Sequence, residues 1–289
     1  MSVGESFSSR AYILSSPGLA LFIALLGAPL LMTLVLSFYS FDYNSGGILP
    51  GFSFDNYAEV LSDKYFHRIF GRTFSVALGV TFICVLIGVP EAYILSRMRN
   101  PWKSIFLVIV LGPLLISVIV RTLGWALLLG GKGMISEALQ RLHLIDQPFS
   151  LMFTTTGMVI ALVHVLVPFM VLSVWASLQR IDPQVEDAAL TLGAGRFTVM
   201  RRIVIPQVMP GILSGSMIVF ALTASAFATP SIIGGRRLKV VATTAYDEYL
   251  NTLNWPLGAA IALLLLIANV IIIMSYNRFI EKRFAKVFE

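Results

Sequence analysis

The chain has 289 residues, of which 57% are hydrophobic and 12% are charged. Soluble domains average about 45–50% hydrophobic residues and about 25% charged residues. This composition excludes a soluble globular protein and predicts about six membrane spans of roughly 20 residues. Residues 1–289 then form a single transmembrane domain, with no room for a separate soluble one. The net charge of +6 indicates lipid head groups as partners and no nucleic acid, because the basic residues flank apolar runs.

The first half of the chain predicts three spans. The first, at about 12–38, is expected to stay in the membrane because no small-residue cleavage site directly follows it. A short helix is expected at 54–61, with Ser53 or Asp55 as its cap. The next spans are predicted at about 69–95 and 104–129, and a short amphipathic surface helix follows them.

The second half predicts three more spans and one long polar connection. The spans cover about 151–178, 207–230 and 256–276, and the connection covers 179–206. Lys and Arg are somewhat more frequent on the side that holds the chain ends and this connection. Because basic residues favour the inner side of the membrane, both termini and the connection are expected in the cytoplasm.

The connection between the fourth and fifth spans carries local signals for a helix and a turn. Asp182 can accept hydrogen bonds from free N–H groups and Pro183 suits a first helical position, so a short helix is expected from here to near Gly193. Gly193 and Gly195 are expected to allow a backbone reversal that a β-carbon would hinder. Pro206 is expected to keep the helix from running unbroken into the fifth span.

The same connection carries a longer pattern, which is Asp187-Ala188-Ala189, three residues, Gly193, nine residues, Ile203, one residue and Ile205-Pro206. It resembles the EAA loop of binding-protein-dependent ABC importer permeases, whose pattern is E-A-A, x3, G, x9, I, x, L-P. Asp187 stands where Glu is usual, with Glu186 just before it, and Ile205 stands where Leu is usual. Both departures keep charge or apolarity. The pattern also lies between the fourth and fifth apolar segments, as in the family, so the signal is specific.

The resemblance implies a permease subunit of the bacterial inner membrane with an all-α, six-helix MetI-like fold and a cytoplasmic coupling-helix loop. It implies four kinds of partner: a second permease subunit, two cytoplasmic ABC ATPase subunits, a periplasmic solute-binding protein and membrane lipid. The chain has no phosphate-binding G-x-x-x-x-G-K-[ST] loop and no nucleophile–base pair, so we expect no enzyme activity and no cofactor. The residues implied to couple to the ATPase are Glu186, Asp187, Ala188, Ala189, Leu192, Gly193, Ala194, Arg196, Ile203 and Pro206.

Arg121 is the clearest charge inside an apolar run, and such charges are costly in hydrocarbon. One interpretation places Arg121 on the substrate path inside the bundle, with Trp125 one turn later on the same face. The alternative is an arginine that extends to the outer head groups. The stretch from Arg121 to Trp125 is similar to the R-T-x-x-W signature of polyamine-type permeases, which favours the first interpretation.

Three other residues inside apolar runs have simpler interpretations. Glu91 lies near the cytoplasmic end of its span, which favours a structural or gate-lining role over binding of solute. His164 has no second ligand at metal-binding spacing and is interpreted as a hydrogen-bonded core histidine, so no metal site is expected. Cys84 is interpreted as a small buried apolar residue.

Tyr246, Asp247 and Glu248, followed by Tyr249, could attract an amine through Coulomb forces and cation–π contacts. They could equally form a solvated loop or a docking surface for a binding protein. The resemblance is nearest to spermidine/putrescine-type permeases, which implies a polyamine or related amine. An opine, an amino-acid derivative or an inorganic anion stays open, because Arg121 does not suit a polycation. The alternative function is a stand-alone secondary transporter or channel, which would need titratable residues at mid-membrane.

Overall fold

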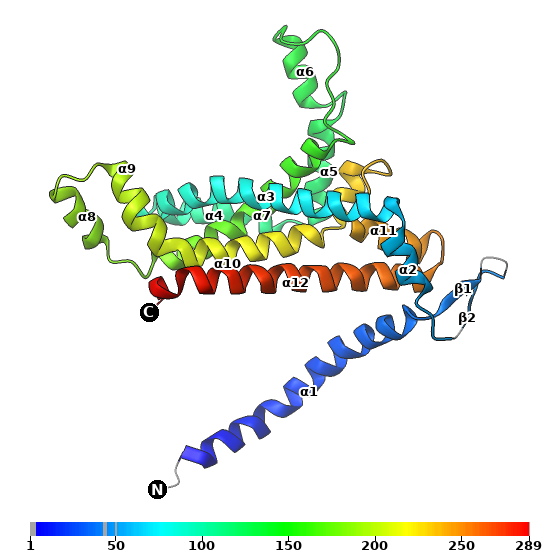
Figure 1. Ribbon diagram of the computed structural model, residues 1–289. Helices are drawn as coiled ribbons and strands as arrows, with labels where there is room; N and C mark the ends of the chain where they lie inside the picture. Colours follow the sequence, from blue (N-terminus) through cyan, green and yellow to red (C-terminus); the bar gives the residue numbers. More distant parts are fainter. Residues whose placement is uncertain (1–3, 43–44, 50, 289) are drawn as a thin grey trace. The chain divides into compact units, whose positions relative to one another are not determined.

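The computed structural model describes residues 4–42, 45–49 and 51–288, and these are almost entirely helical (Figure 1). Within these described ranges, six helical segments are long and apolar enough to cross a membrane, as expected. They are Leu14–Leu36, Lys64–Arg97, Val118–Arg141, Thr155–Leu178, Arg196–Ala224 and Trp255–Arg278.

The chain divides into two compact units, Met1–Lys64 with Thr244–Leu266, and Tyr65–Thr243 with Ile267–Glu289. The elements from the N-terminus to the third span are α1 (Gly4–Leu36), β1 (Ser40–Asp42), β2 (Gly47–Leu49), α2 (Asp55–Ser62), α3 (Lys64–Arg97), α4 (Trp102–Leu115) and α5 (Val118–Leu129). Those that follow are α6 (Met134–Arg141), α7 (Thr155–Leu178), α8 (Pro183–Thr191), α9 (Arg196–Val199), the π-helical turn η1 (Met200–Val204), α10 (Ile205–Ala224), the π-helical turn η2 (Pro230–Gly234), α11 (Val241–Leu250) and α12 (Trp255–Phe288). The single transmembrane domain expected from the sequence stays a prediction.

The first unit is held together where α1 ends and α2 begins. Asn56 is buried, and its side-chain amide donates to the backbone carbonyls of Ser37 at 2.9 Å and Tyr39 at 2.8 Å. Ser53 Oγ accepts from the backbone N–H of Asp55 at 3.0 Å, at the start of α2. The short helix expected at 54–61 is therefore confirmed as α2. The two hydrogen bonds of the Asn56 amide hold the first turn of α2 against the segment that follows α1.

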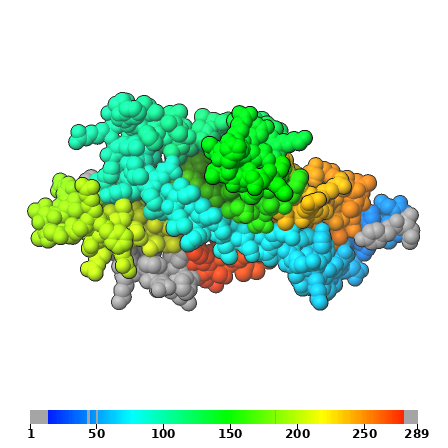
Figure 2. All heavy atoms as spheres, turned by 90° about the horizontal axis from the view of Figure 1, so that it is seen from above, coloured from blue at the N-terminus to red at the C-terminus, as the bar shows by residue number. Residues whose placement is uncertain are grey.

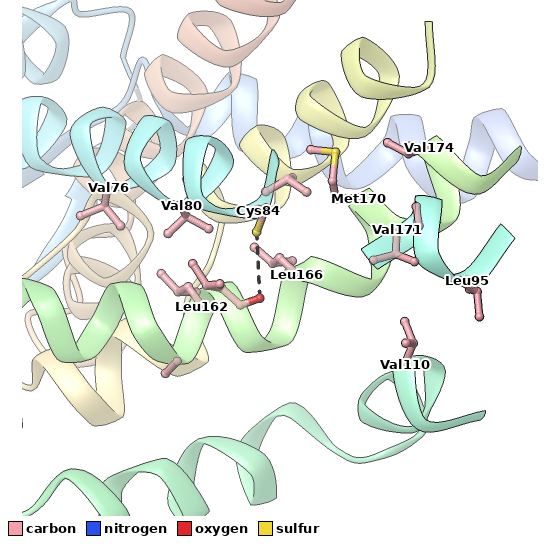
Figure 3. Close-up of a cluster of buried hydrophobic side chains, with 14 of the residues drawn as sticks. Val76, Val80, Cys84, Leu95, Val110, Leu162, Leu166, Met170, Val171 and Val174 are labelled. Carbon is pink, nitrogen blue, oxygen red and sulfur yellow. Dashed lines mark hydrogen bonds between the residues drawn. The ribbon is translucent and has the colours of Figure 1, made fainter. Parts of the chain in front are cut away.

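The core of the second unit lies along α7. One face of α3, with Val76, Val80 and Cys84, packs against Leu162 and Leu166 of α7 (Figure 3). The side chain of Cys84 is fully buried and its Sγ lies 4.0 Å from the carbonyl of Val163, which confirms its interpretation as a small buried residue.

The C-terminal half of α7 packs closely on α10 because α10 has glycines there. A β-carbon on Gly211 would lie 2.5 Å from Ser177 Oγ and 2.6 Å from the carbonyl oxygen of Ser173. A β-carbon on Gly215 would lie 2.8 Å from the sulfur of Met170. Small residues that let two helices approach are typical of packing between membrane helices.

The stretch predicted as the third span, 104–129, is not one continuous helix. α4 ends at Leu115, Ile116 is extended with φ −96° and ψ 139°, and α5 begins only at Val118. Pro113 cannot donate a backbone hydrogen bond, which weakens the last turn of α4. The break places Arg121 in the first turn of α5, beside an interruption of the helical backbone.

Candidate functional site

The helix expected between the fourth and fifth spans is present as α8. Asp182 is its N-cap residue, and the side-chain Oδ1 accepts from the backbone N–H of Gln184 at 3.0 Å. The helix ends at Thr191, and Gly193 then adopts φ +88°, a left-handed conformation that favours glycine. The expected start and reversal are confirmed at these positions.

The role expected for Gly195 is wrong. Its backbone is extended, with φ −67° and ψ 151°, and no atom lies within 4 Å of the position that a β-carbon would occupy. A residue with a side chain could therefore adopt this conformation. The reversal after α8 depends on Gly193 alone among the two glycines.

The helix break expected at Pro206 is also wrong. The chain stays helical from Arg196 to Ala224, through α9, η1 and α10. The turn Met200–Val204 is π-helical, and Pro206 follows it in the first turn of α10. The wider π-helical turn changes the hydrogen-bond pattern just where proline lacks a donor, so the helix continues without a break.

Glu186 attaches α8 to the end of α3. Only 5% of this residue is exposed, its Oε2 accepts from the Tyr93 hydroxyl at 3.0 Å, and its Oε1 forms an ion pair with Arg97 Nη2. The Arg97 guanidinium also lies over the Tyr93 ring, 5.5 Å from the ring centroid. The sequence pattern implied that Glu186 contacts an ATPase, but its side chain is occupied within its own chain.

Tyr93 and Arg97 were missed as part of this loop. They are spaced by four residues in α3, so they lie one turn apart on the same face of that helix. The sequence does carry a signal for their contact with Glu186. A tyrosine and an arginine lie four residues apart at the end of one span, and two adjacent carboxylates follow in a later loop.

The opposite side of α8 is exposed. Figures 1 and 2 show that α8 and α9 project beyond the ends of α3 and α10. Val185, Ala188 and Leu192, which we call the loop face, follow the helical spacing i, i+3, i+7, and Leu192 is 88% exposed. Phe197 in α9 is 78% exposed. Apolar side chains exposed at the end of a helical bundle are typical of a protein contact surface.

The remaining residues implied to couple differ in their exposure. The exposed ones are Asp187, Gly193 and Arg196, and the half-buried ones are Ala189, Ala194, Ile203 and Pro206. Asp187 is therefore exposed, whereas the carboxylate of Glu186 is buried. The two adjacent acids have different surroundings, which the pattern alone could not distinguish.

Arg121 is only 9% exposed and lines a cavity of about 640 Å³ with residues of α4, α5, α7 and α10. Its Nε and Nη1 have no hydrogen-bond partner among the described residues. The side chain is thus turned into the second unit and does not extend away from it. Thr122, the next residue, hydrogen-bonds Thr229 at 3.1 Å and ties α5 to the segment before η2.

Trp125 and His164 form a pair across α5 and α7. Trp125 Nε1 donates to His164 Nδ1 at 3.1 Å, and their ring centroids are 5.4 Å apart. The prediction that His164 is hydrogen-bonded is confirmed, but the residue is exposed and does not lie in the core. Glu91 is half-buried in α3, and its gate-lining role stays a prediction.

The group Tyr246, Asp247 and Glu248 lies in α11, in the part of the chain that belongs to the first unit, whereas Arg121 and Trp125 belong to the second. Asp247 Oδ1 accepts from Asn251 at 2.8 Å, and Glu248 Oε2 is 2.6 Å from the Thr252 hydroxyl. These contacts stabilise the C-terminal end of α11. An attraction between this group and an amine stays a prediction.

Two side chains of the first unit, Glu59 and Tyr249, have raised pKa values. Burial raises the pKa of Glu59, and the nearby carboxylates of Glu248 and Asp63 raise it further. Burial likewise raises the pKa of Tyr249, against a smaller lowering by its hydrogen bond with Thr33. The carboxylates of Glu59, Glu248 and Asp63 therefore lie close enough to repel one another.

Comparison with known proteins identifies the family. Residues 13–286 match the family described as the binding-protein-dependent transport system inner membrane component. The spermidine/putrescine transport system permease protein PotB of Escherichia coli is 31% identical over 250 residues, covering 86% of this chain and 90% of PotB. The inner membrane ABC transporter permease protein YdcU of Escherichia coli is 28% identical over 291 residues, covering 92% of this chain and 90% of YdcU.

Among solved structures, one chain of a bacterial alginate ABC transporter, crystallised with an alginate-bound periplasmic protein, has a TM-score of 0.76. Its sequence is 17% identical, and the match covers 97% of this chain and 96% of that one. This similarity supports the fold. Together with the family match over residues 13–286, it shows that the chain belongs to the binding-protein-dependent transport system inner membrane components and is a multi-pass ABC importer permease subunit that does not itself hydrolyse ATP.

Proposed function

We propose that this subunit forms half of the translocation path of an importer for a small amine, and that partner ATPases move it through α8. The observation that carries the proposal is the geometry of α8. One side of this helix is attached to α3 through Glu186, and the other side exposes the loop face. Such an element can transmit movement, because a partner that holds the loop face also holds the end of α3.

The proposed coupling needs α8 to move as a rigid body. Closure of two ATPase subunits around ATP would displace the loop face, and the contact between Glu186 and Arg97 would carry that displacement to α3. The continuous helix from Arg196 to Ala224 would carry it to α10. Movement of α3 and α10 together would then alternate the path between inward-open and outward-open states.

The proposed assembly contains a second permease subunit, two cytoplasmic ATPase subunits and a periplasmic solute-binding protein. The family description, which names a binding-protein-dependent system, supports these partners. The alginate transporter with the same fold was crystallised with a periplasmic protein. The side of the membrane follows from the basic residues near α8, so we propose that this loop and both termini lie in the cytoplasm.

A polyamine is the proposed solute. The 31% identity to PotB supports it, as does the sequence from Arg121 to Trp125. Tyr246, Asp247 and Glu248 are the proposed contacts of the amine, because carboxylates and aromatic rings are the groups that attract ammonium ions. An opine, an amino-acid derivative or an inorganic anion would instead favour a contact with Arg121.

Uptake by the complete importer tests this proposal. Proteoliposomes loaded with ATP, with the binding protein outside, are expected to accumulate radiolabelled spermidine, and unlabelled putrescine is expected to compete. Uptake that needs ATP but is specific for an anion would overturn the proposal that the solute is an amine. It would leave the proposal of ATPase coupling standing. Uptake without ATP or ATPase subunits would overturn the coupling and indicate a secondary transporter.

A further inference from the structure

A cavity beside the break between α4 and α5 is a second candidate binding site. The cavity of about 640 Å³ next to this break falls in the size range of sites for small organic ligands, about 300–1,000 Å³. Its walls are apolar side chains of α4, α7 and α10 and of the segment after α10, including Leu115, Leu162, Leu166, Phe169, Leu222 and Phe227. A ligand that fills this cavity must therefore be largely apolar.

Among the residues that the structure describes, Arg121 is the one charged residue that lines this cavity, and no acidic residue lines it. Its side chain is more than nine-tenths buried, and the Nε and Nη1 donors have no partner among the described residues. Leaving buried donors of a charged group unpaired is costly, whereas a carboxylate or phosphate would pair with the guanidinium in a bidentate manner. The charge of Arg121 is thus available to an anion.

The N-terminus of α5 adds a second, independent attraction for an anion. Ser117 is the N-cap residue of this 12-residue helix, and no side chain caps the first turn. The first N–H groups of a helix have no acceptor within the helix, and the helix dipole is positive at this end. Ser117 and Val118 line the same cavity as Arg121, so both positive features act at one place.

We propose that this cavity binds one anionic group, a carboxylate or a phosphate, carried on an apolar body. The anion lies between Arg121 and the first turn of α5, and the apolar body lies against α7 and α10. A polyamine does not bind there, because the guanidinium repels ammonium groups. The site is therefore distinct from the proposed amine contacts in α11.

Binding of octanoate to the purified importer in nanodiscs of zwitterionic lipid tests the proposal directly. Octanoate is expected to bind saturably, and octylammonium, which has the same chain length, is expected not to bind. Arg121→Gln is expected to weaken octanoate binding about tenfold or more, because a charge-assisted pair is lost. Arg121→Lys is expected to keep part of the affinity, and Arg141→Gln, which removes an exposed cation of α6, is expected to leave it unchanged.

Two further measurements keep the test decisive. Ala226→Leu narrows the cavity without changing Arg121 and is expected to weaken octanoate more than acetate, even if Arg121→Gln does not fold. Nanodiscs with phosphatidylglycerol distinguish the sources of the anion. Displacement of octanoate by this lipid assigns a lipid phosphate, and no displacement assigns a free carboxylate. Absence of saturable octanoate binding, or equal binding of octylammonium, would overturn the proposal.

Discussion

Gly193→Val is expected to abolish the stimulation of ATP hydrolysis by the solute-loaded binding protein, while the subunit still inserts in the membrane. Gly193 has φ +88°, and a β-branched residue at positive φ costs about 1–3 kcal/mol or forces the backbone to change. No atom lies within 4 Å of the added β-carbon, so the effect arises from the backbone alone. The reversal after α8 would change direction, and the loop face would no longer meet its partner.

Two variants serve as controls for this result. Gly195→Val lies two residues later in extended backbone with open space around it, so stimulation is expected to stay near that of the wild type. Gly193→Asn is expected to retain part of the stimulation, because asparagine tolerates left-handed backbone better than valine. ATPase activity of the reconstituted importer, with and without binding protein, is the measurement. Normal stimulation in Gly193→Val would refute a role of this turn in coupling.

Glu186→Gln is expected to reduce transport at least tenfold and to leave ATP hydrolysis without solute largely intact. The buried carboxylate is the contact between α8 and α3; glutamine keeps one acceptor oxygen but loses the charge, and its NH2 group faces one of the two donors, Arg97 or Tyr93. The isolated subunit is expected to lose about 1–3 kcal/mol of stability, because a hydrogen-bonded charge pair is broken. Transport by proteoliposomes and thermal unfolding in detergent measure the two effects.

Asp187→Asn is the matched control for Glu186→Gln. Asp187 is exposed on the same helix, so thermal stability is expected to be unchanged even if ATPase coupling falls. The double variant Glu186→Gln with Arg97→Gln is expected to lose less stability than the sum of the single variants, since each change removes the same pair. Strictly additive losses would show that the pair does not hold α8 to α3.

Local signals explain why much of this fold could be predicted from the sequence. The six membrane-spanning helices could be predicted from the six apolar segments. In hydrocarbon a segment must satisfy its own backbone hydrogen bonds, and a helix does so. Asp182 and Gly193 fix the ends of α8 through capping and a left-handed turn, which depend on neighbouring residues only. The family pattern then gave this helix a functional interpretation.

Features that depend on distant contacts could not be predicted in the same way. The break at Ile116 lies between two apolar segments, so hydropathy gives no sign of it. Pro113 does not identify it either, because prolines also lie inside the continuous helices α3 and α7. The inward direction of Glu186 depends on Arg97, 89 residues earlier in the chain. The unpartnered donors of Arg121 lie in a cavity built from several helices, which no single segment specifies.

The position of the loop face against an ATPase subunit is tested most directly by cross-linking from Leu192→Cys. The native chain has one cysteine, Cys84, which is fully buried, so the introduced thiol is the accessible one for a maleimide–benzophenone reagent. Leu144→Cys, in an exposed position after α6, is the matched control. Our account predicts a cross-link from Leu192→Cys to the ATPase subunit in inverted vesicles, with a yield that changes on ATP binding, and none from Leu144→Cys. Labelling of Leu192→Cys from the outside of intact cells, or cross-linking to lipid alone, would contradict it.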